Sequence, residues 1–541
     1  MIKLLFSYFP IILLIFLMVK KNNMPSSKAL PLTALVTYGI MLFFFQQDPN
    51  LIHATALKGL LVAWTPILII AGAIFLFRTM EATGSLNNIR DWLNSVSSNR
   101  IAQLMIVGWA FPFLIEGASG FGTPAAIAAP VLIGLGFPPL RVAIFALITN
   151  SVPVSFGAVG TPTWFGFSAI SLTEAETMAI GFKSAILNSS AAFFIVPIAL
   201  MFVVKPGKIL KNWLFILLSI LATLIPYLIL SRFSYEFPSL VGGAVGLIMT
   251  VFLAHKGIGL SKEEVELQNS DKDPHFSSVS HRNTHTLHPR KSNLLLATFP
   301  LWGTILLLVL TRIPQFGLKG LLTLTDPALH LKLGSLGGFN LSPALVMGLE
   351  NIFGTNVSWS HALLYVPSLL PFLVISLITL LLYGDLKKTK SVFKITATQM
   401  QGPVLALSGA LVFVNLMMMG GDQSAVKLIG NHLAHLTGSM WTYTAQFLGA
   451  IGTFFSGSNT ISNLTFGGIQ DAIATDLGLN RTTVLAMQSV GGAMGNMICI
   501  NNIVAVASVL GLVKVEGYIL KRTVRAMLVY GIVVGIVAIF L

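Results

Sequence analysis

Apolar residues fill the chain in long uninterrupted runs, which short polar segments separate. Each run is long enough for an α-helix to cross a membrane, a length of about 20 residues. The pattern therefore predicts an all-α polytopic membrane protein with about 12 transmembrane helices. The predicted spans are 2–19, 31–47, 57–77, 139–168, 179–204, 212–230, 239–254, 294–311, 362–383, 400–420, 482–511 and 523–541.

Composition supports this interpretation. Of the 541 residues, 55% are hydrophobic and only 10% are charged, which leaves no room for a soluble catalytic domain. The first run ends at Lys20 and Lys21 and has no small-residue cleavage site, so we expect a retained span rather than a signal peptide. The net charge of +14 comes from bases scattered between the runs, a distribution that favours topology signals over nucleic-acid binding.

The distribution of Lys and Arg predicts which loops face the cytoplasm. It places both termini outside and leaves two apolar stretches, 101–137 and 441–477, that must return to the side where they began. Each stretch is therefore predicted to be a re-entrant hairpin, the first from the cytoplasmic face and the second from the outer face. The predicted organisation is an N-terminal transmembrane half 1–254 with hairpin 101–137, a cytoplasmic linker 255–293, and a C-terminal transmembrane half 294–541 with hairpin 441–477.

The two halves repeat one order of features: a span, a hairpin, a basic exit and a long broken span. EGASGFGT at 116–123 aligns with SGSNTISN at 456–463, and SFGAVGTP at 155–162 falls opposite NMICINNI at 496–503. The span before the first hairpin runs inward and the span before the second runs outward, so the two repeats are predicted to be inverted. Inverted repeats with discontinuous helices are typical of secondary transporters.

Glycine and proline break the helices at both hairpins and in the broken spans. Close helix packing is one explanation of these glycines. A cavity explains them better, because freed backbone groups at membrane depth must be satisfied by protein or by a wet cavity. Half-helix N-termini in such a cavity would bind the carboxylate of a small organic anion. The predicted substrate-binding residues are Ser119, Gly120, Thr123, Ser155, Thr161, Ser456, Ser458, Asn459, Thr460 and Asn463.

Glu116 is the only acid in the first hairpin, and a charge at membrane depth costs at least roughly 2.5–3.5 kcal/mol. It is either a hydrogen-bonded clamp on the hairpin or a protonatable coupling site. Coupling is favoured, because an anion entering a negative-inside cell works against roughly 2.3 kcal/mol per 100 mV, and one accompanying proton removes that cost. Sodium is the other candidate, because the oxygens of SGSNT at 456–460 resemble ligands of hard cations.

An enzyme is a distant alternative. GASG at 117–120 matches the nucleophile motif of rhomboid-type intramembrane serine proteases, a chemistry that needs a histidine at membrane depth. All ten histidines fall in loops or at span edges of the predicted topology. His281, His285 and His288 have a spacing that could bind a metal, but the charges around them favour a solvated tether. Neither a metal nor a cofactor is predicted.

Four sequence blocks carry a family resemblance. They are EGASGFGTPAAIAAPVLIGLGFPPL at 116–140, NSVPVSFGAVGTP at 150–162, SGSNTISN at 456–463 and GLVKVEGYILKRTV at 511–524. On these blocks the chain resembles the bacterial L-lactate permease family over essentially its full length. The resemblance implies a multi-pass carrier in the bacterial inner membrane that takes up L-lactate with a proton and also accepts D-lactate and glycolate.

The hairpins also look like the Ser-Asn-Thr tips of sodium-coupled dicarboxylate carriers, which implies a wider ion-transporter fold. In this resemblance Glu116, Ser119 and Thr123 fall on the first tip, and the second tip is formed by Ser458, Asn459 and Thr460. The chain departs from the lactate family where members often have Asp in place of Asn459, Lys in place of Asn496 and Ser-Pro-Gln in place of 499–501. This loss of charge implies that Glu116 carries more of the proton handling here, or that the coupling differs.

Overall fold

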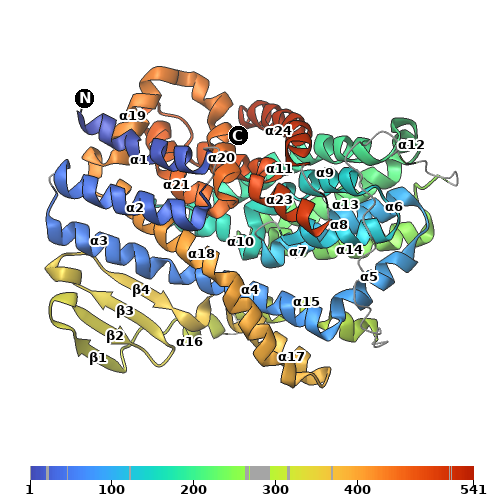
Figure 1. Ribbon diagram of the computed structural model, residues 1–541, viewed down its shortest axis with the longest axis horizontal. Helices are drawn as coiled ribbons and strands as arrows, with labels where there is room; N and C mark the ends of the chain where they lie inside the picture. Colours follow the sequence, from blue (N-terminus) through green and yellow to red (C-terminus); the bar gives the residue numbers. More distant parts are fainter. Residues whose placement is uncertain are drawn as a thin grey trace. The chain divides into compact units, whose positions relative to one another are not determined.

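The computed structural model is built almost entirely of helices (Figure 1). The residues that it describes are 2–19, 24–45, 47–120, 123–261, 267, 293–312, 317–366, 369–510, 512 and 515–541. Most of the predicted linker 255–293 lies outside them, as do His281, His285 and His288. The predicted all-α multi-pass architecture is confirmed, with one small sheet added in the described part.

Eight helices of the described chain are long and apolar enough to cross a membrane, or nine if the bent pair Pro139–Thr149 and Val152–Trp164 is one span. One of the eight is Arg100–Ala118, which the sequence predicted as a hairpin arm. This count is lower than the predicted 12, because the other predicted spans do not combine that length and composition within the described residues. Three shorter apolar stretches of the described residues are Ile2–Met18, Leu294–Leu307 and Pro371–Leu382.

The chain divides into two compact units, and each unit takes segments from both halves of the sequence. Unit 1 comprises Met1–Thr83, Thr298–Thr437 and Asp471–Asp476, and unit 2 comprises Gly84–Ala297, Gly438–Gln470 and Leu477–Leu541. The early part of each half therefore folds into unit 1 and the later part into unit 2. This is the partition expected of a duplicated chain whose corresponding segments pack together.

Unit 1 is a bundle of apolar helices around a long central helix. Its helices are α1 (Ile2–Val19), α2 (Ser26–Phe43), α3 (Pro49–Val62), α4 (Trp64–Thr83), α15 (Leu294–Arg312), α16 (Leu318–Leu322), α17 (Leu369–Leu382), α18 (Thr389–Met418) and α19 (Ala425–Thr437). Helix α18 packs against α2, α3 and α4. A Cβ at Gly59 would lie only 2.7 Å from Val412 Cα, so glycine lets α3 and α18 approach closely.

A four-stranded antiparallel sheet occupies a segment of unit 1 for which the sequence analysis predicted no element. Its strands, in spatial order, are β1 (Leu329–Lys332), β2 (Gly338–Leu341), β3 (Val346–Glu350) and β4 (Trp359–Ala362). Figure 1 shows the sheet beside α3, and Leu349 and Ile352 pack with Ala54 of that helix in a buried cluster. Burial of apolar surface therefore fixes the sheet on the bundle.

The N-terminal part of unit 2 contains the first hairpin and the first broken span. Its elements are α5 (Ser85–Val96), α6 (Arg100–Met105), π-helix η1 (Ile106–Ala110), α7 (Phe111–Ser119), α8 (Thr123–Gly134), α9 (Pro139–Thr149), 3₁₀ turn η2 (Val152–Phe156), α10 (Gly157–Trp164), α11 (Glu174–Val203), α12 (Pro206–Lys211), α13 (Trp213–Ser231) and α14 (Pro238–Lys256). Arg100, at the start of the first arm, donates to the Leu135 carbonyl just beyond the end of α8. The start of α6 thus lies beside the end of α8, and the re-entrant hairpin 101–137 stays a prediction.

The C-terminal part of unit 2 repeats this arrangement. Its elements are α20 (Trp441–Ser456), α21 (Asn459–Asp476), α22 (Arg481–Gly495), 3₁₀ turn η10 (Asn496–Ile498), α23 (Ile500–Val509) and α24 (Glu516–Ala538). Trp441 Nε1 donates to Gln470 Oε1 at 2.7 Å, which holds the two arms of the second hairpin together. The re-entrant hairpin 441–477 likewise stays a prediction.

The N-terminal and C-terminal parts of unit 2 pack against each other through corresponding helices. Helix α11 lies against α9 and α22, and α24 lies against α22 and α9. Each long span is interrupted by a 3₁₀ turn, with a bend of 42° at η2 in the first. Such exchange of equivalent contacts is expected of two copies of one motif. The inverted orientation of the copies stays a prediction.

Candidate functional site

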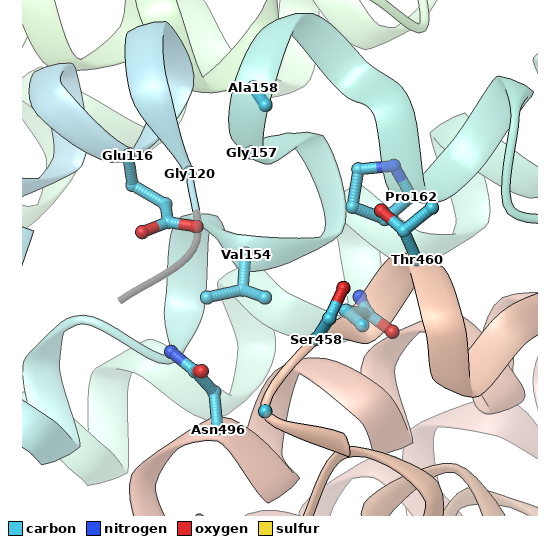
Figure 2. A pocket seen from close by; sticks show the side chains of 11 residues that line it. Glu116, Gly120, Val154, Gly157, Ala158, Pro162, Ser458, Thr460 and Asn496 are labelled. Atoms are coloured by element: carbon cyan, nitrogen blue, oxygen red, sulfur yellow. The ribbon is translucent and has the colours of Figure 1, made fainter. Parts of the chain in front are cut away.

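A narrow cavity lies in unit 2 where the two hairpins approach each other. Its lining comes from both hairpins and from both broken spans, and consists of Glu116, Gly120, Val154, Gly157, Ala158, Pro162, Gly457, Ser458, Asn459, Thr460 and Asn496. Figure 2 shows Glu116 entering from the N-terminal repeat, whereas Ser458, Thr460 and Asn496 enter from the C-terminal repeat. The cavity volume is about 20 Å³, room for one water-sized group. A larger ligand requires the walls to move apart.

The first tip, residues 116–120, carries the only acid of the lining. Helix α7 ends at Ser119, and Gly120 turns the chain with φ of 64° and ψ of −160°, a conformation that favours glycine. The Glu116 side chain is 2% exposed, and its Oε2 accepts a hydrogen bond from Asn150 Nδ2 at 3.2 Å. No described Lys or Arg forms an ion pair with it. The carboxyl group is therefore buried beside a neutral amide.

The second tip, residues 456–460, is polar and contains no acid. Helix α20 ends at the left-handed Gly457, whose N–H donates to the Thr453 carbonyl at 2.8 Å, and α21 starts at Asn459. The Thr460 hydroxyl forms no hydrogen bond with a described residue and points into the space in Figure 2. In the first turn of α21 the Ile461 N–H donates to Ser458 Oγ at 3.4 Å, and the helix N-terminus gives this tip a partial positive charge. Such a helix N-terminus is suited to an anion.

Asn459 lines the cavity, but its side chain anchors the tip to α22. Its Nδ2 donates to the Ser489 carbonyl at 2.9 Å, while its Oδ1 lies over Gly492, where a Cβ would overlap it. Neither Asn459 Oδ1 nor Thr453 Oγ1 has a hydrogen-bond partner among the described residues, although both are buried. Two unpartnered oxygens therefore lie around Gly492, directly behind the second tip.

The broken spans complete the walls. In α10 the backbone of Ala158, Val159 and Gly160 is left-handed, with φ of 45°, 57° and 69°. Trp164 Nε1 donates to the Val159 carbonyl at 3.0 Å and steadies this turn, which is unusual for a β-branched residue. In the second span Asn502 Nδ2 donates to the Asn496 carbonyl at 3.2 Å and also to Asn496 Oδ1. These bonds occupy the oxygens of Asn496. Its side-chain Nδ2 group can therefore donate to a ligand in the cavity.

The structure brings five of the eleven predicted site residues to the cavity, and four others form hydrogen bonds elsewhere. Glu116 and four of the predicted binding residues, Gly120, Ser458, Asn459 and Thr460, line it. The side chains of the predicted residues Ser119 and Thr123 lie outside what the structure describes.

Four predicted binding residues satisfy neighbouring polar groups instead. Thr161 and Ser456 donate to the carbonyls of Ala158 and Gly452 in their own helices, and Asn463 Nδ2 donates to the Pro162 carbonyl at 2.9 Å. Ser155 Oγ accepts a hydrogen bond from Asn188 Nδ2 at 3.0 Å and donates to the Ser489 carbonyl at 3.4 Å. Their polarity serves the helix breaks, because carbonyls freed by a break need donors at membrane depth.

Several lining residues were absent from the predicted set. Gly157 and Pro162 were recognisable as helix breakers, and Asn496 as the residue opposite Ser155 in the repeat alignment. Val154 carries no signal in the sequence, because one more apolar residue in an apolar span cannot be distinguished from its neighbours. Within the described residues, no group of three or more His, Cys, Asp or Glu side chains is placed to hold a metal.

Comparison with known proteins decides the family. The L-lactate permease family matches residues 3–541 of the chain. The chain belongs to the L-lactate permease family. It is 48% identical over 542 residues to a putative L-lactate permease of Haemophilus influenzae, covering 100% of this chain and 99% of the relative.

Two further family relatives are more distant. The L-lactate permease of Bacillus subtilis (strain 168) is 28% identical over 508 residues, covering 90% of this chain and 86% of the relative. The glycolate permease of Escherichia coli (strain K12) is 25% identical over 522 residues, covering 94% and 90%.

Membership of this family establishes the class of protein. The chain is a multi-pass membrane transport protein and not an enzyme. The family resemblance inferred from the four sequence blocks is confirmed, and the intramembrane protease alternative is excluded. The cavity between the two tips is accordingly a candidate substrate site rather than a catalytic centre.

Proposed function

We propose that this permease imports L-lactate, and also D-lactate and glycolate, across the bacterial inner membrane by proton symport. Relatives that match 90–100% of the chain are named for lactate and glycolate. The observation that carries the proposal is the buried carboxyl group of Glu116 in the cavity where both hairpin tips meet.

The second tip and Asn496 supply the groups that a small hydroxy acid needs. The substrate carboxylate accepts hydrogen bonds from the first turn of α21 and from the Asn496 amide, and the Thr460 hydroxyl reaches the same space. These donors are neutral, so the cavity holds one anion without a fixed positive side chain among its described lining. The small number of donors in the lining favours a compact anion in this proposal.

Glu116 is the coupling residue in this proposal. An ionised carboxylate without an ion-pair partner is costly to bury, and a second carboxylate beside it would add repulsion. Protonation of Glu116 removes both costs, so that substrate and proton enter together. One monoanion with one proton crosses without opposing the membrane potential, which otherwise costs roughly 2.3 kcal/mol per 100 mV.

The narrow cavity implies that transport includes separation of the tips. A volume of about 20 Å³ is too small for a hydroxy acid, so the described conformation has the tips closed on each other. Opening of the cavity to one side and then the other would deliver the substrate.

A sodium-coupled carrier of small carboxylates or dicarboxylates is the second candidate. It is favoured by the two buried oxygens without described partners, Asn459 Oδ1 and Thr453 Oγ1, which lie around Gly492. Hard cations bind such oxygens. In this alternative the cation sits behind the second tip and Glu116 is a hydrogen-bonded structural group.

Purified protein in liposomes separates the two candidates. Labelled L-lactate is presented with an inward proton gradient alone, then with an inward sodium gradient alone at equal pH. Accumulation driven by the proton gradient supports the proposal, and accumulation that requires sodium replaces it with the second candidate. Competition by D-lactate, glycolate and a dicarboxylate then ranks the substrates.

A further inference from the structure

A second cavity lies in unit 1, separate from the candidate substrate site. It is an open pocket bordered by α2, α3 and α18 together with the 3₁₀ turns η4 (Gly334–Leu336) and η5 (Ile352–Gly354) next to the sheet, and its volume is about 750 Å³. Nearly all of its walls are apolar. The proposed transport mechanism uses none of its residues.

The cavity has the shape of a slot. On α2 the lining runs from Pro31 to Tyr38, on α3 from His53 to Leu60 and on α18 from Leu405 to Val412. Each of these stretches covers about 10 Å of helix. An elongated apolar slot parallel to three membrane helices suits an extended hydrocarbon chain better than a compact solute.

Glycine contacts fix the spacing of the three helices around the slot. A Cβ at Gly59 would lie 2.7 Å from Val412 Cα, and one at Gly409 would overlap the backbone at Pro31. The backbones of α3 and α2 therefore touch α18 beside the cavity. The slot lies between helices held at close contact, so its walls are preformed and do not reflect loose packing.

The slot opens on the surface of unit 1. Three exposed leucines line it: Leu35, Leu60 and Leu405 are 66%, 48% and 53% exposed. Helices α2 and α18 are each long and apolar enough to cross a membrane, and so is the stretch that α3 forms with α4. In a membrane their outer surfaces contact lipid. A lipid chain can therefore enter the slot sideways without crossing water.

A polar pair stands at one end of the slot. Tyr38, in the last turns of α2, and His53, in the first turns of α3, meet with Tyr38 Oη 2.6 Å from His53 Nδ1. The ring of Phe353 lies 6.3 Å from the His53 ring and flanks the same end. Tyrosine and histidine near helix ends are suited to the membrane interface, where ester and phosphate groups of lipids lie.

We propose that this slot binds one acyl chain of a membrane phospholipid, with the glycerol ester region beside Tyr38 and His53. The chain lies along α18 between α2 and α3 and fills apolar volume that would otherwise lack packing partners. The phospholipid is thereby a structural component of unit 1. This inference is independent of the substrate and of the coupling ion.

A photoreactive phospholipid tests the proposal. The full-length protein is reconstituted with a phosphatidylcholine that carries a diazirine in one acyl chain, irradiated, and mapped by peptide mass spectrometry. We expect labelling of the slot-lining segments of α2, α3 and α18 several-fold above that around Phe194 and Met201, which are lipid-exposed residues of α11 at 54% and 46% exposure. Equal labelling of the two regions overturns the proposal.

A pair of variants and a second probe sharpen this test. Ala56→Trp places a ring in the slot, and we expect it to reduce slot labelling several-fold, whereas Val245→Trp, at a 38% exposed position of α14, should leave it unchanged. Because the wild-type labelling ratio is measured first, misfolding of Ala56→Trp does not remove the test. Labelling by a diazirine fatty acid but not by the phospholipid would show a different occupant and would also overturn the proposal.

Discussion

The two hairpin tips occupy equivalent places in the repeat but differ in chemistry. The first tip brings a buried carboxyl group, Glu116, with one amide donor from Asn150. The second tip brings hydroxyl and backbone N–H groups at the start of α21 and has no acid. Both helix breaks end at a glycine with positive φ, Gly120 and Gly457, but their side chains differ.

This difference suggests a division of roles between the tips. In the proposed mechanism the proton is carried at the first tip, because Glu116 is the only acid within the described lining. An anion is better placed at the second tip, where the helix N-terminus is partially positive. The following experiments test whether energy coupling and substrate affinity are separable in this way.

The largest effect is expected for Glu116→Gln. The amide retains the size and the hydrogen-bonding capacity of the side chain but cannot release a proton. We expect the variant to fold and to exchange lactate across liposomes at equilibrium, while proton-driven accumulation is abolished. Glu174→Gln, at an exposed position in the first turn of α11, is the matched control and should accumulate lactate normally. Uphill uptake by Glu116→Gln at the wild-type level would remove Glu116 from coupling.

Gly157→Ala and Gly492→Ala compare the two tips without removing any functional group from either of them. A Cβ at Gly157 would lie 2.5 Å from Glu116 Oε1, and a Cβ at Gly492 would overlap Asn459 Oδ1. Each added methyl group displaces one tip residue at an overpacking cost of about 1–3 kcal/mol. We expect Gly157→Ala to reduce gradient-driven accumulation more than exchange, and Gly492→Ala to raise the half-saturation concentration in both assays.

The control for both is Gly207→Ala, since a Cβ at Gly207 meets no atom within 4 Å. If Gly157→Ala and Gly492→Ala gave the same phenotype, the separation of roles between the tips would be wrong. If Gly492→Ala abolished a dependence on sodium, the sodium-coupled candidate would gain support.

A smaller effect is expected for Thr460→Val, which removes one hydroxyl from the second tip and preserves the shape of the side chain. A hydrogen bond to a charged group contributes roughly 1.5–3 kcal/mol, so the half-saturation concentration for lactate should rise about tenfold or more. Thr475→Val, at an exposed position near the other end of α21, is the control. Unchanged half-saturation in Thr460→Val, measured by exchange of labelled lactate, would exclude this hydroxyl from the site.

The comparison also explains which parts of the site the sequence predicts. Helix breaks are readable, because Gly120, Gly157 and Gly457 interrupt apolar runs and each lies in the cavity wall. The direction of a side chain cannot be predicted from the sequence. Thr161 and Ser456 were therefore predicted as substrate ligands, although the structure shows them donating to carbonyls of their own helices. A hydroxyl beside a helix break has two possible partners, substrate or backbone, and only the fold decides between them.

The fold, like the site, could be predicted from the sequence only in part. Apolar runs predict the multi-pass helical architecture, because hydrocarbon excludes unpaired backbone groups. The sheet β1–β4 escaped prediction: its strands have only four or five residues, and all four residues of β1 are exposed, so no apolar alternation marks them. The contact of both tips with one cavity was predictable only from the repeat, since 116–120 and 456–460 are far apart in the sequence.

The smallest effect is expected for Asn463→Ala, in the second turn of α21. Its Nδ2 donates to the Pro162 carbonyl at 2.9 Å, so it joins the second hairpin to the broken first span without lining the cavity. Asn463 Oδ1 also accepts a hydrogen bond from Gln488 Nε2 at 3.3 Å. Loss of a neutral hydrogen bond destabilises a protein by about 1 kcal/mol, so we expect the loss of these two bonds to lower the unfolding temperature in detergent. The half-saturation concentration should stay at the wild-type value. A large rise in that concentration with unchanged stability would place Asn463 among the substrate ligands, and the second tip would then extend one turn further along α21 than its described lining indicates.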